Sequence, residues 1–236
     1  MEEFLKENYK ILTLSIEFLA AFSSLYFYHK YKNTAAKFFI YFIFYLFICD
    51  FISLNYYYFV NNYLVFFKGT ILEKNKWWST LYWKIGAIIF YSFYYNKILK
   101  KSIFKILLKT LTYCFLIISF VKIFKNWDDF FVISFPIISI LGAIIILMCS
   151  IFYFIEGLEY NKILVFYKSI NFYISVSIFI WWLIITPLVF YDLYFSTSDW
   201  NFVILKWQIY LFANIFMYTT FTIGLIVSKP ENSSNE

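Results

Sequence analysis

The chain has 236 residues, of which 63% are hydrophobic, 27% aromatic and only 14% charged, and its mean hydropathy is +0.71. Soluble domains are about half apolar and a quarter charged, so this composition excludes an ordinary water-soluble enzyme and indicates a protein embedded in lipid. The net charge of +6 comes from 20 lysines without a single arginine and without a basic block. That pattern argues against nucleic acid as a partner.

The apolar residues form long continuous runs, which are typical of helices and not of the alternating strands of a membrane β-barrel. A helix that crosses a bilayer needs about 20 mainly apolar residues. The sequence therefore predicts an all-α protein, a polytopic transmembrane helical bundle that forms a single domain. Its seven predicted spans cover residues 11–28, 38–60, 77–95, 106–123, 130–155, 170–191 and 202–227, followed by a short cytoplasmic tail, 228–236.

The distribution of lysine predicts the orientation of the bundle. Lysines are more numerous in the turns after the first, third and fifth predicted spans than in the other turns and the N-terminal segment. Because lysine-rich turns stay in the cytoplasm, we expect the N-terminus outside and the C-terminus inside. Glu2, Glu3 and Glu7 give the first residues the wrong charge for a cleavable signal peptide, so the first span is expected to remain.

Four ionisable side chains are predicted to lie at membrane depth, where they cost several kcal/mol and mark candidate sites. Glu17, Asp50 and Lys84 fall in the outer halves of the first three spans, and Lys206 lies near the outer end of the seventh. We expect the first three to form a buried polar network that lines or braces a ligand site. Lys206 is more simply a residue that extends its ammonium group to the interface.

Helical spacing gives Glu17 an inward-facing position. Thr13, Ala20, Ala21 and Ser24 share its helix face and form a small, polar stripe suited to close helix packing. A carboxylate beside a lysine can equally lock helices in register without binding a ligand, so both roles stay open for the network.

Three further positions have simpler interpretations. Asn214 shares a face of the last span with two tyrosines and is a weaker site candidate. Pro136 is expected near the outer end of the fifth span, where a kink is easily accommodated. Residues 156–159, with Glu156 and Glu159, are predicted to form a solvated turn at the inner end of that span.

The sequence contains no recognisable set of catalytic residues. It has no GxSxG, HExxH or glycine-rich phosphate loop, and its single histidine has no cysteine cluster near it in the sequence. We therefore expect no enzymatic activity, no cofactor and no metal site.

Several short segments resemble a family of membrane proteins. They are the tyrosine- and lysine-rich end of the first span (26–32), Asp50 midway in the second, the segment 152–156 closing the fifth, and 214–218 in the last. In these segments and in layout, the chain resembles seven-helix membrane proteins of flavobacteria and their relatives. Those proteins are often found beside sensory histidine kinases, and the layout is similar to the sensor regions of bacterial signalling proteins.

The resemblance implies a sensory or accessory module in the bacterial inner membrane, with the lipid bilayer and a histidine kinase or other membrane protein as partners. Because only nine residues follow the last predicted span, we expect such a module to signal through a separate protein. Two other classes stay open beside it, a small transporter or channel subunit and a structural subunit of a membrane complex. An intramembrane enzyme acting on lipid is the weakest alternative.

Overall fold

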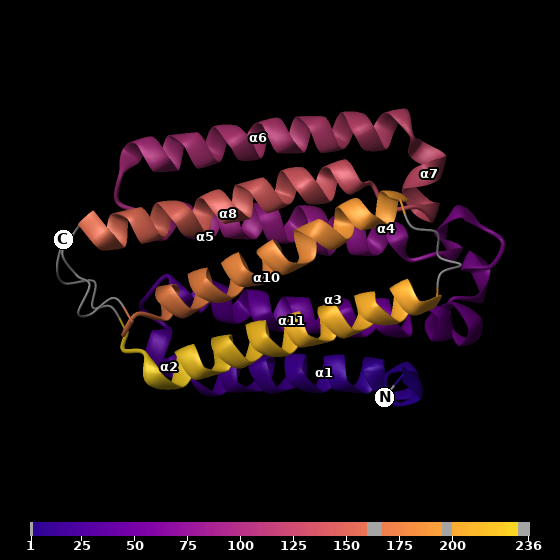
Figure 1. Cartoon of the computed structure of the whole chain (residues 1–236), viewed down its shortest axis with the longest axis horizontal. Helices are drawn as coiled ribbons and strands as arrows, with labels where there is room; N and C mark the ends of the chain where they lie inside the picture. The colour runs from indigo at the N-terminus through magenta and orange to yellow at the C-terminus, as the bar shows by residue number, and fades with distance from the viewer. Residues whose placement is uncertain (1, 160–166, 195–199, 231–236) are drawn as a thin grey trace.

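The computed structural model describes residues 2–159, 167–194 and 200–230, and these residues are almost entirely helical, with no strand among them (Figure 1). The all-α prediction is therefore confirmed. The predicted tail lies outside the described residues from position 231 onward.

The helices follow the predicted spans closely in most of the chain. Seven long helical segments occur in the described residues, one of which joins three labelled elements, and short helices and 3₁₀ turns connect them. In chain order the elements are α1 (Glu2–Tyr26), α2 (Tyr28–Tyr31), α3 (Ala36–Asn62), η1 (Val65–Phe67), η2 (Ile71–Glu73), α4 (Lys76–Ser79), η3 (Thr80–Ala87), α5 (Ile88–Ile98), α6 (Ser102–Lys125), α7 (Trp127–Val132), α8 (Pro136–Glu159), α10 (Ile170–Tyr194) and α11 (Trp200–Val227).

The prediction of one helix across 130–155 is wrong at its start. The short helix α7 ends at Val132, and α8 begins only at Pro136. Proline lacks the backbone N–H that would continue the helix, and its ring disfavours helical geometry at the preceding residue, Phe135. Pro136 therefore begins a new helix, the position in which proline is best tolerated, and does not kink an existing one.

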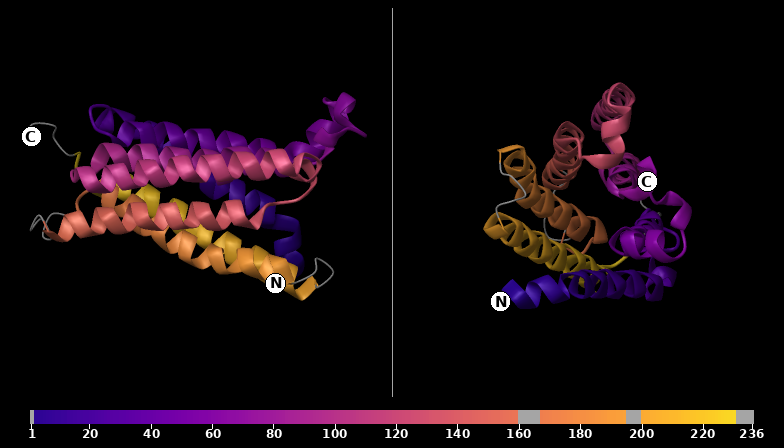
Figure 2. Two further views of the ribbon diagram at one scale, coloured as in Figure 1. Left: turned by 90° about the horizontal axis from the view of Figure 1, so that it is seen from above. Right: turned by 90° about the vertical axis from the view of Figure 1, so that its right-hand side faces the viewer.

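Six of the long segments form a closed ring, and α6 packs outside it (Figure 2). Around the ring, α1 contacts α3 and α11, α10 lies between α11 and α8, and the helix formed by η3 and α5 joins α8 to α3. Helix α6 packs mainly against α5 and α8, and its end contacts α7. Aromatic side chains fill the ring, among them Phe39, Tyr94 and Phe221, all of which are fully buried.

Five helices are long and apolar enough to cross a membrane by length and composition: Ala36–Asn62, Ser102–Lys125, Pro136–Glu159, Ile170–Phe190 and Asn201–Val227. This supports a multi-pass membrane protein. Helix α1 has several charged residues in its first half, and the segment from Lys76 to Ile98 is divided by a π-helical stretch, so neither meets the same criterion.

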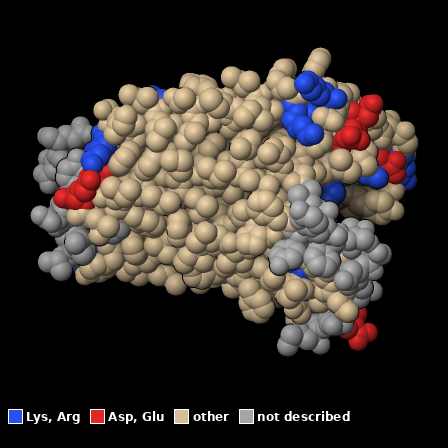
Figure 3. Space-filling model, turned by 45° about the horizontal axis from the view of Figure 1, so that its top comes forward, with Lys and Arg blue, Asp and Glu red and all other residues tan. Residues whose placement is uncertain are grey.

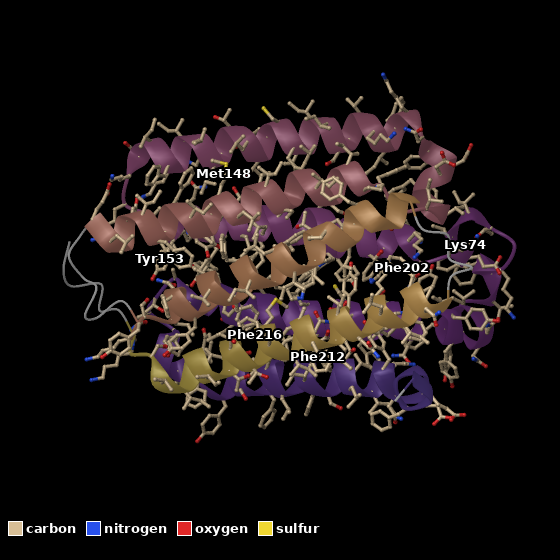
Figure 4. All side chains as sticks on the ribbon, in the orientation of Figure 1. Lys74, Met148, Tyr153, Phe202, Phe212 and Phe216 are labelled. Atoms are coloured by element: carbon tan, nitrogen blue, oxygen red, sulfur yellow. The ribbon has the colours of Figure 1, made fainter. Side chains whose placement is uncertain are left out.

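The surface agrees with a membrane setting. Lys, Asp and Glu side chains gather towards the two ends of the face in Figure 3, and its broad middle is formed by other residues. Phe212 and Phe216, one turn apart on α11 (Figure 4), are two of many large apolar side chains exposed along the helices. Contact of such an apolar surface with lipid is favourable, whereas its exposure to water is unfavourable.

The two ends of the bundle differ in charge. Helix α1 begins at one end of the bundle and α11 stops at the other (Figure 1), and we call these the N-terminal end and the C-terminal end. Lys74, in the connection between α3 and α4, lies at the N-terminal end (Figure 4). The turns at the C-terminal end contain the larger group of described lysines: Lys30, Lys32, Lys37, Lys97, Lys100, Lys101, Lys168 and Lys229.

Glu156 corrects the prediction of a solvated turn at 156–159. It lies within α8, is only 5% exposed, and accepts hydrogen bonds from the backbone N–H groups of Lys100 (2.8 Å) and Lys101 (2.7 Å). These two residues lead into α6, so the carboxylate sits where the first N–H groups of a helix lack partners and the helix dipole favours negative charge. Glu159 is more exposed and forms an ion pair with the Lys101 ammonium group.

We expect Glu156→Gln to lower the free energy of unfolding by about 1–3 kcal/mol, because one carboxylate oxygen is replaced by an N–H₂ group that faces a backbone donor. Unfolding of the detergent-solubilised protein by a denaturing detergent would measure the loss. Glu159→Gln is the matched control and should cost no more than about 1 kcal/mol, as expected for an exposed ion pair. Equal losses in the two variants would contradict the capping role.

Candidate functional site

The polar stripe predicted on the first span is buried in the ring. Thr13 is 5% exposed and Glu17 is 2% exposed, and Ala20, Ala21 and Ser24 on the same face are buried as well. The small side chains let α1 approach its neighbours α3 and α11 closely. The prediction of an inward-facing Glu17 is confirmed.

Two oxygens on this stripe have no hydrogen-bond partner among the described residues. They are Oε2 of Glu17 and Oγ1 of Thr13, which lie one helical turn apart. Glu17 also makes no ion pair within the described parts of the chain. A buried polar atom without a partner is costly, so this position is a candidate site on structural grounds.

Asp50 lies on α3 and has a defined partner. The hydroxyl of Tyr82, on η3, donates a hydrogen bond to its carboxylate. One turn earlier in the same helical segment, the indole N–H of Trp78 donates to the backbone carbonyl of Cys49 (3.1 Å). The segment from Lys76 to Ile98 is therefore hydrogen-bonded to α3 at two successive residues, Cys49 and Asp50, and these bonds fix the position of Asp50.

The π-helical geometry of η3 contributes to this arrangement. A π-helix has a wider turn than an α-helix, occurs rarely, and is often found at functional sites. At Gly86 a Cβ atom would lie 3.1 Å from the carbonyl oxygen of Leu81, five residues earlier, so the wide turn leaves little room for a side chain there. The change in helical repeat sets which side chains of this segment face α3.

Glu17 and Asp50 are close enough to interact electrostatically across the contact between α1 and α3. Tyr9, Tyr82 and Tyr218 each lie within electrostatic range of both carboxylates. These five residues come from four elements, α1, α3, η3 and α11, and we refer to them as the carboxylate–tyrosine cluster. It contains two groups that can gain or lose a proton and three phenolic hydroxyls that can donate a hydrogen bond.

Lys84 lies in η3 two residues after Tyr82 and is half-buried. Neither Glu17 nor Asp50 forms an ion pair with it. The structure thus places the two predicted acids within electrostatic range of each other, and Asp50 is hydrogen-bonded to Tyr82. The role of these residues in ligand binding stays a prediction.

The two weaker candidates lie on α11. The side-chain oxygen of Asn214 accepts a hydrogen bond from the indole of Trp181 (2.8 Å), which packs edge-on against Trp83. Asn214 therefore joins α10 to α11 beside a group of indole rings. Lys206 is half-buried in the first part of α11, next to Trp207, whose ring stacks on Tyr9.

Tyr82 and Tyr9 are the members of the cluster that the sequence did not single out. The chain contains 23 tyrosines, so a tyrosine that contacts a carboxylate cannot be recognised by residue type. The one feature of the sequence that could have indicated Tyr82 is its spacing of four residues from Trp78, which puts two hydrogen-bond donors on the same face of a helix.

Within the described residues, no group of three or more His, Cys, Asp and Glu side chains is placed to hold a metal ion. Comparison with protein-family models, with curated proteins and with solved structures found no match to this chain.

A double-mutant cycle tests the bond between α3 and η3. We expect Asp50→Asn and Tyr82→Phe each to destabilise the detergent-solubilised protein, and the double variant to lose less than the sum, with a coupling free energy of about 0.5–3 kcal/mol. Tyr57→Phe, at an exposed tyrosine of α3, is the control and should be additive with Asp50→Asn. Additivity in both cycles would show that the Tyr82 bond does not contribute to stability.

Proposed function

We propose that this chain is a non-enzymatic sensory or accessory module of a bacterial inner membrane, whose state is set at the carboxylate–tyrosine cluster. The observation that supports this most directly is Glu17, a carboxyl group buried in the ring with an oxygen that lacks a hydrogen-bond partner among the described residues. Ionisable groups at membrane depth are costly, and they mark sites of binding or switching more often than sites of simple packing.

The proposal includes a topology of seven spans, with the N-terminus outside and the C-terminus inside. It is supported by seven long helical segments in the described residues and by the start of α1 and the end of α11 at opposite ends of the bundle (Figure 1). The lysines of the C-terminal end favour the cytoplasmic side for that end. In this topology α1 and the segment from Lys76 to Ile98 also cross the membrane, with Glu17 and Tyr82 buried in the ring.

Reporter fusions test the orientation. Alkaline phosphatase fused after Lys229 should be inactive, whereas the same enzyme inserted after Gly69, in the connection between α3 and α4, should be active. Gly69 has a positive φ of 72° in an exposed turn, where an insertion disturbs little packing. The opposite pattern of activities would reverse the proposed orientation.

The partner is proposed to be a separate signalling protein, such as a histidine kinase, that contacts the cytoplasmic end. The end of α5 and the turn to α6 offer exposed lysines, including Lys97 and Lys100, to an acidic partner surface or to anionic lipid. Lys97 lies over the rings of Phe38 and Phe93, so its charge is held at a defined place on this end.

Affinity purification of a C-terminally tagged chain from native membranes, followed by mass spectrometry, tests the partner. We expect a kinase in stoichiometric amount, and a several-fold loss of it in the double variant Lys97→Gln and Lys100→Gln. The matched control is Lys68→Gln and Lys74→Gln, which removes two charges from the connection between α3 and α4 and should leave recovery unchanged. Recovery of the wild-type chain alone would contradict a stable signalling partner.

A small transporter or channel subunit is the second candidate, and the π-helical segment Thr80–Ala87 favours it. Irregular helices next to buried charges occur at the substrate sites of transporters. Under this alternative the purified chain would move ions or solutes across liposome membranes without a partner.

A further inference from the structure

The two carboxyl groups of the cluster differ in their surroundings. Asp50 accepts a hydrogen bond from Tyr82, which stabilises a negative charge on Asp50. Glu17 has no described donor for its Oε2 atom and is only 2% exposed, so an ionised Glu17 would be a buried anion with incomplete hydrogen bonding. Its neutral form avoids most of that cost.

From this geometry we propose that Glu17 and Asp50 together bind one proton, and that this proton is the ligand of the carboxylate–tyrosine cluster. The inference rests on the proposed function, in which this cluster is the responsive site. Two like charges within electrostatic range of each other in a low-dielectric interior repel, so one proton shared by the pair leaves a single negative charge. The proton belongs to the pair, with Glu17 as its main location and Asp50 as the charged member.

The other groups that face the pair do not neutralise it. Tyr9 of α1, Tyr82 of η3 and Tyr218 of α11 are phenols, and the thiol of Cys49 lies beside Asp50 on α3, so all four are neutral at pH 7. Neither carboxylate forms an ion pair with a lysine of these elements: Lys10, Lys84 or Lys206. Lys10 instead donates a hydrogen bond to the side chain of Asn55 (2.6 Å).

Thr13 supplies a second, independent indication. Its hydroxyl lies one turn from Glu17 on the same buried face and has no hydrogen-bond partner among the described residues. When the proton leaves, Glu17 becomes a stronger hydrogen-bond acceptor, and the Thr13 hydroxyl, one turn away on the same face of α1, is a group that can donate to it. Loss of the proton therefore leaves two negatively charged carboxylates, one on α1 and one on α3, which repel each other. The newly charged Glu17 also needs additional hydrogen bonds.

The direction of the pH effect follows from this exchange. The folded protein holds a proton that an unfolded, solvated pair would release, so the stabilising contribution is present at low pH and is lost as the pH rises. The contact between α1 and α3 is the part of the ring that loosens at high pH.

Infrared difference spectroscopy of the full chain in lipid nanodiscs tests the proposal. A protonated carboxylic acid gives a C=O stretching band that a carboxylate lacks, and we expect this band at neutral pH with the intensity of one buried group. It should be lost in Glu17→Gln, which keeps the shape of the protonated side chain and should fold. Glu159→Gln, at the partly exposed ion pair, should retain the band.

A second variant keeps the test decisive if Glu17→Gln fails to fold. In Asp50→Asn the neighbouring charge is gone, so the pH at which the Glu17 band disappears should fall by at least about one unit. A wild-type spectrum without the band at neutral pH, or an unchanged midpoint in Asp50→Asn, would overturn the proposal. Loss of the band on adding NaCl at constant pH would also overturn it, in favour of a metal cation.

The outcomes separate this inference from the proposed function. An absent band together with a co-purified kinase removes the proton and leaves the signalling module in place. A band that behaves as expected in a chain recovered without any partner supports the proton site and contradicts the module.

Discussion

The structure depends above all on the fact that lipid offers no hydrogen bonds. Backbone groups that cross the bilayer must be paired within the chain, which makes every long segment a helix, and polar side chains must find partners inside the ring. On the side of α5 and α10, this demand is met by direct pairs: Tyr94 donates to Asn171 (2.5 Å), and Tyr95 shares a hydrogen bond with Ser175 (2.6 Å). On the side of α1, some buried polar atoms have no hydrogen-bond partner among the described residues, and Oε2 of Glu17 is one of them.

This contrast separates groups that stabilise the fold from groups available to bind. Glu156 shows the first kind, because both of its oxygens accept backbone N–H groups and its removal leaves them unpaired. Glu17 shows the second kind, because its Oε2 atom has no hydrogen-bond partner among the described residues and an ionised Glu17 would need one. The same residue type thus has a structural role at one end of the bundle and a candidate switching role within the ring.

The sequence predicted the parts of the fold that depend on single segments. Long apolar runs gave the helices, and the helical spacing around Glu17 gave the buried stripe, because both follow from local periodicity. The start of α8 was missed because the stretch from Phe130 to Pro136 is apolar apart from Ser134, and hydropathy alone cannot detect a backbone break. Tyr82 and Glu156 were missed or misplaced because their partners, Asp50 and the residues before α6, are far away in the sequence.

The π-helical stretch in the segment from Lys76 to Ile98 has a consequence for mechanics. A wide turn stores one surplus residue relative to an α-helix, and moving that surplus along the segment rotates every side chain it passes by about 100° without unwinding the helix. Such a rotation would carry Tyr82 away from α3. The bond from Tyr82 to Asp50 therefore fixes the rotational register of this helix, and under the proposed protonation a change of charge on the two acids would alter how easily the helix turns.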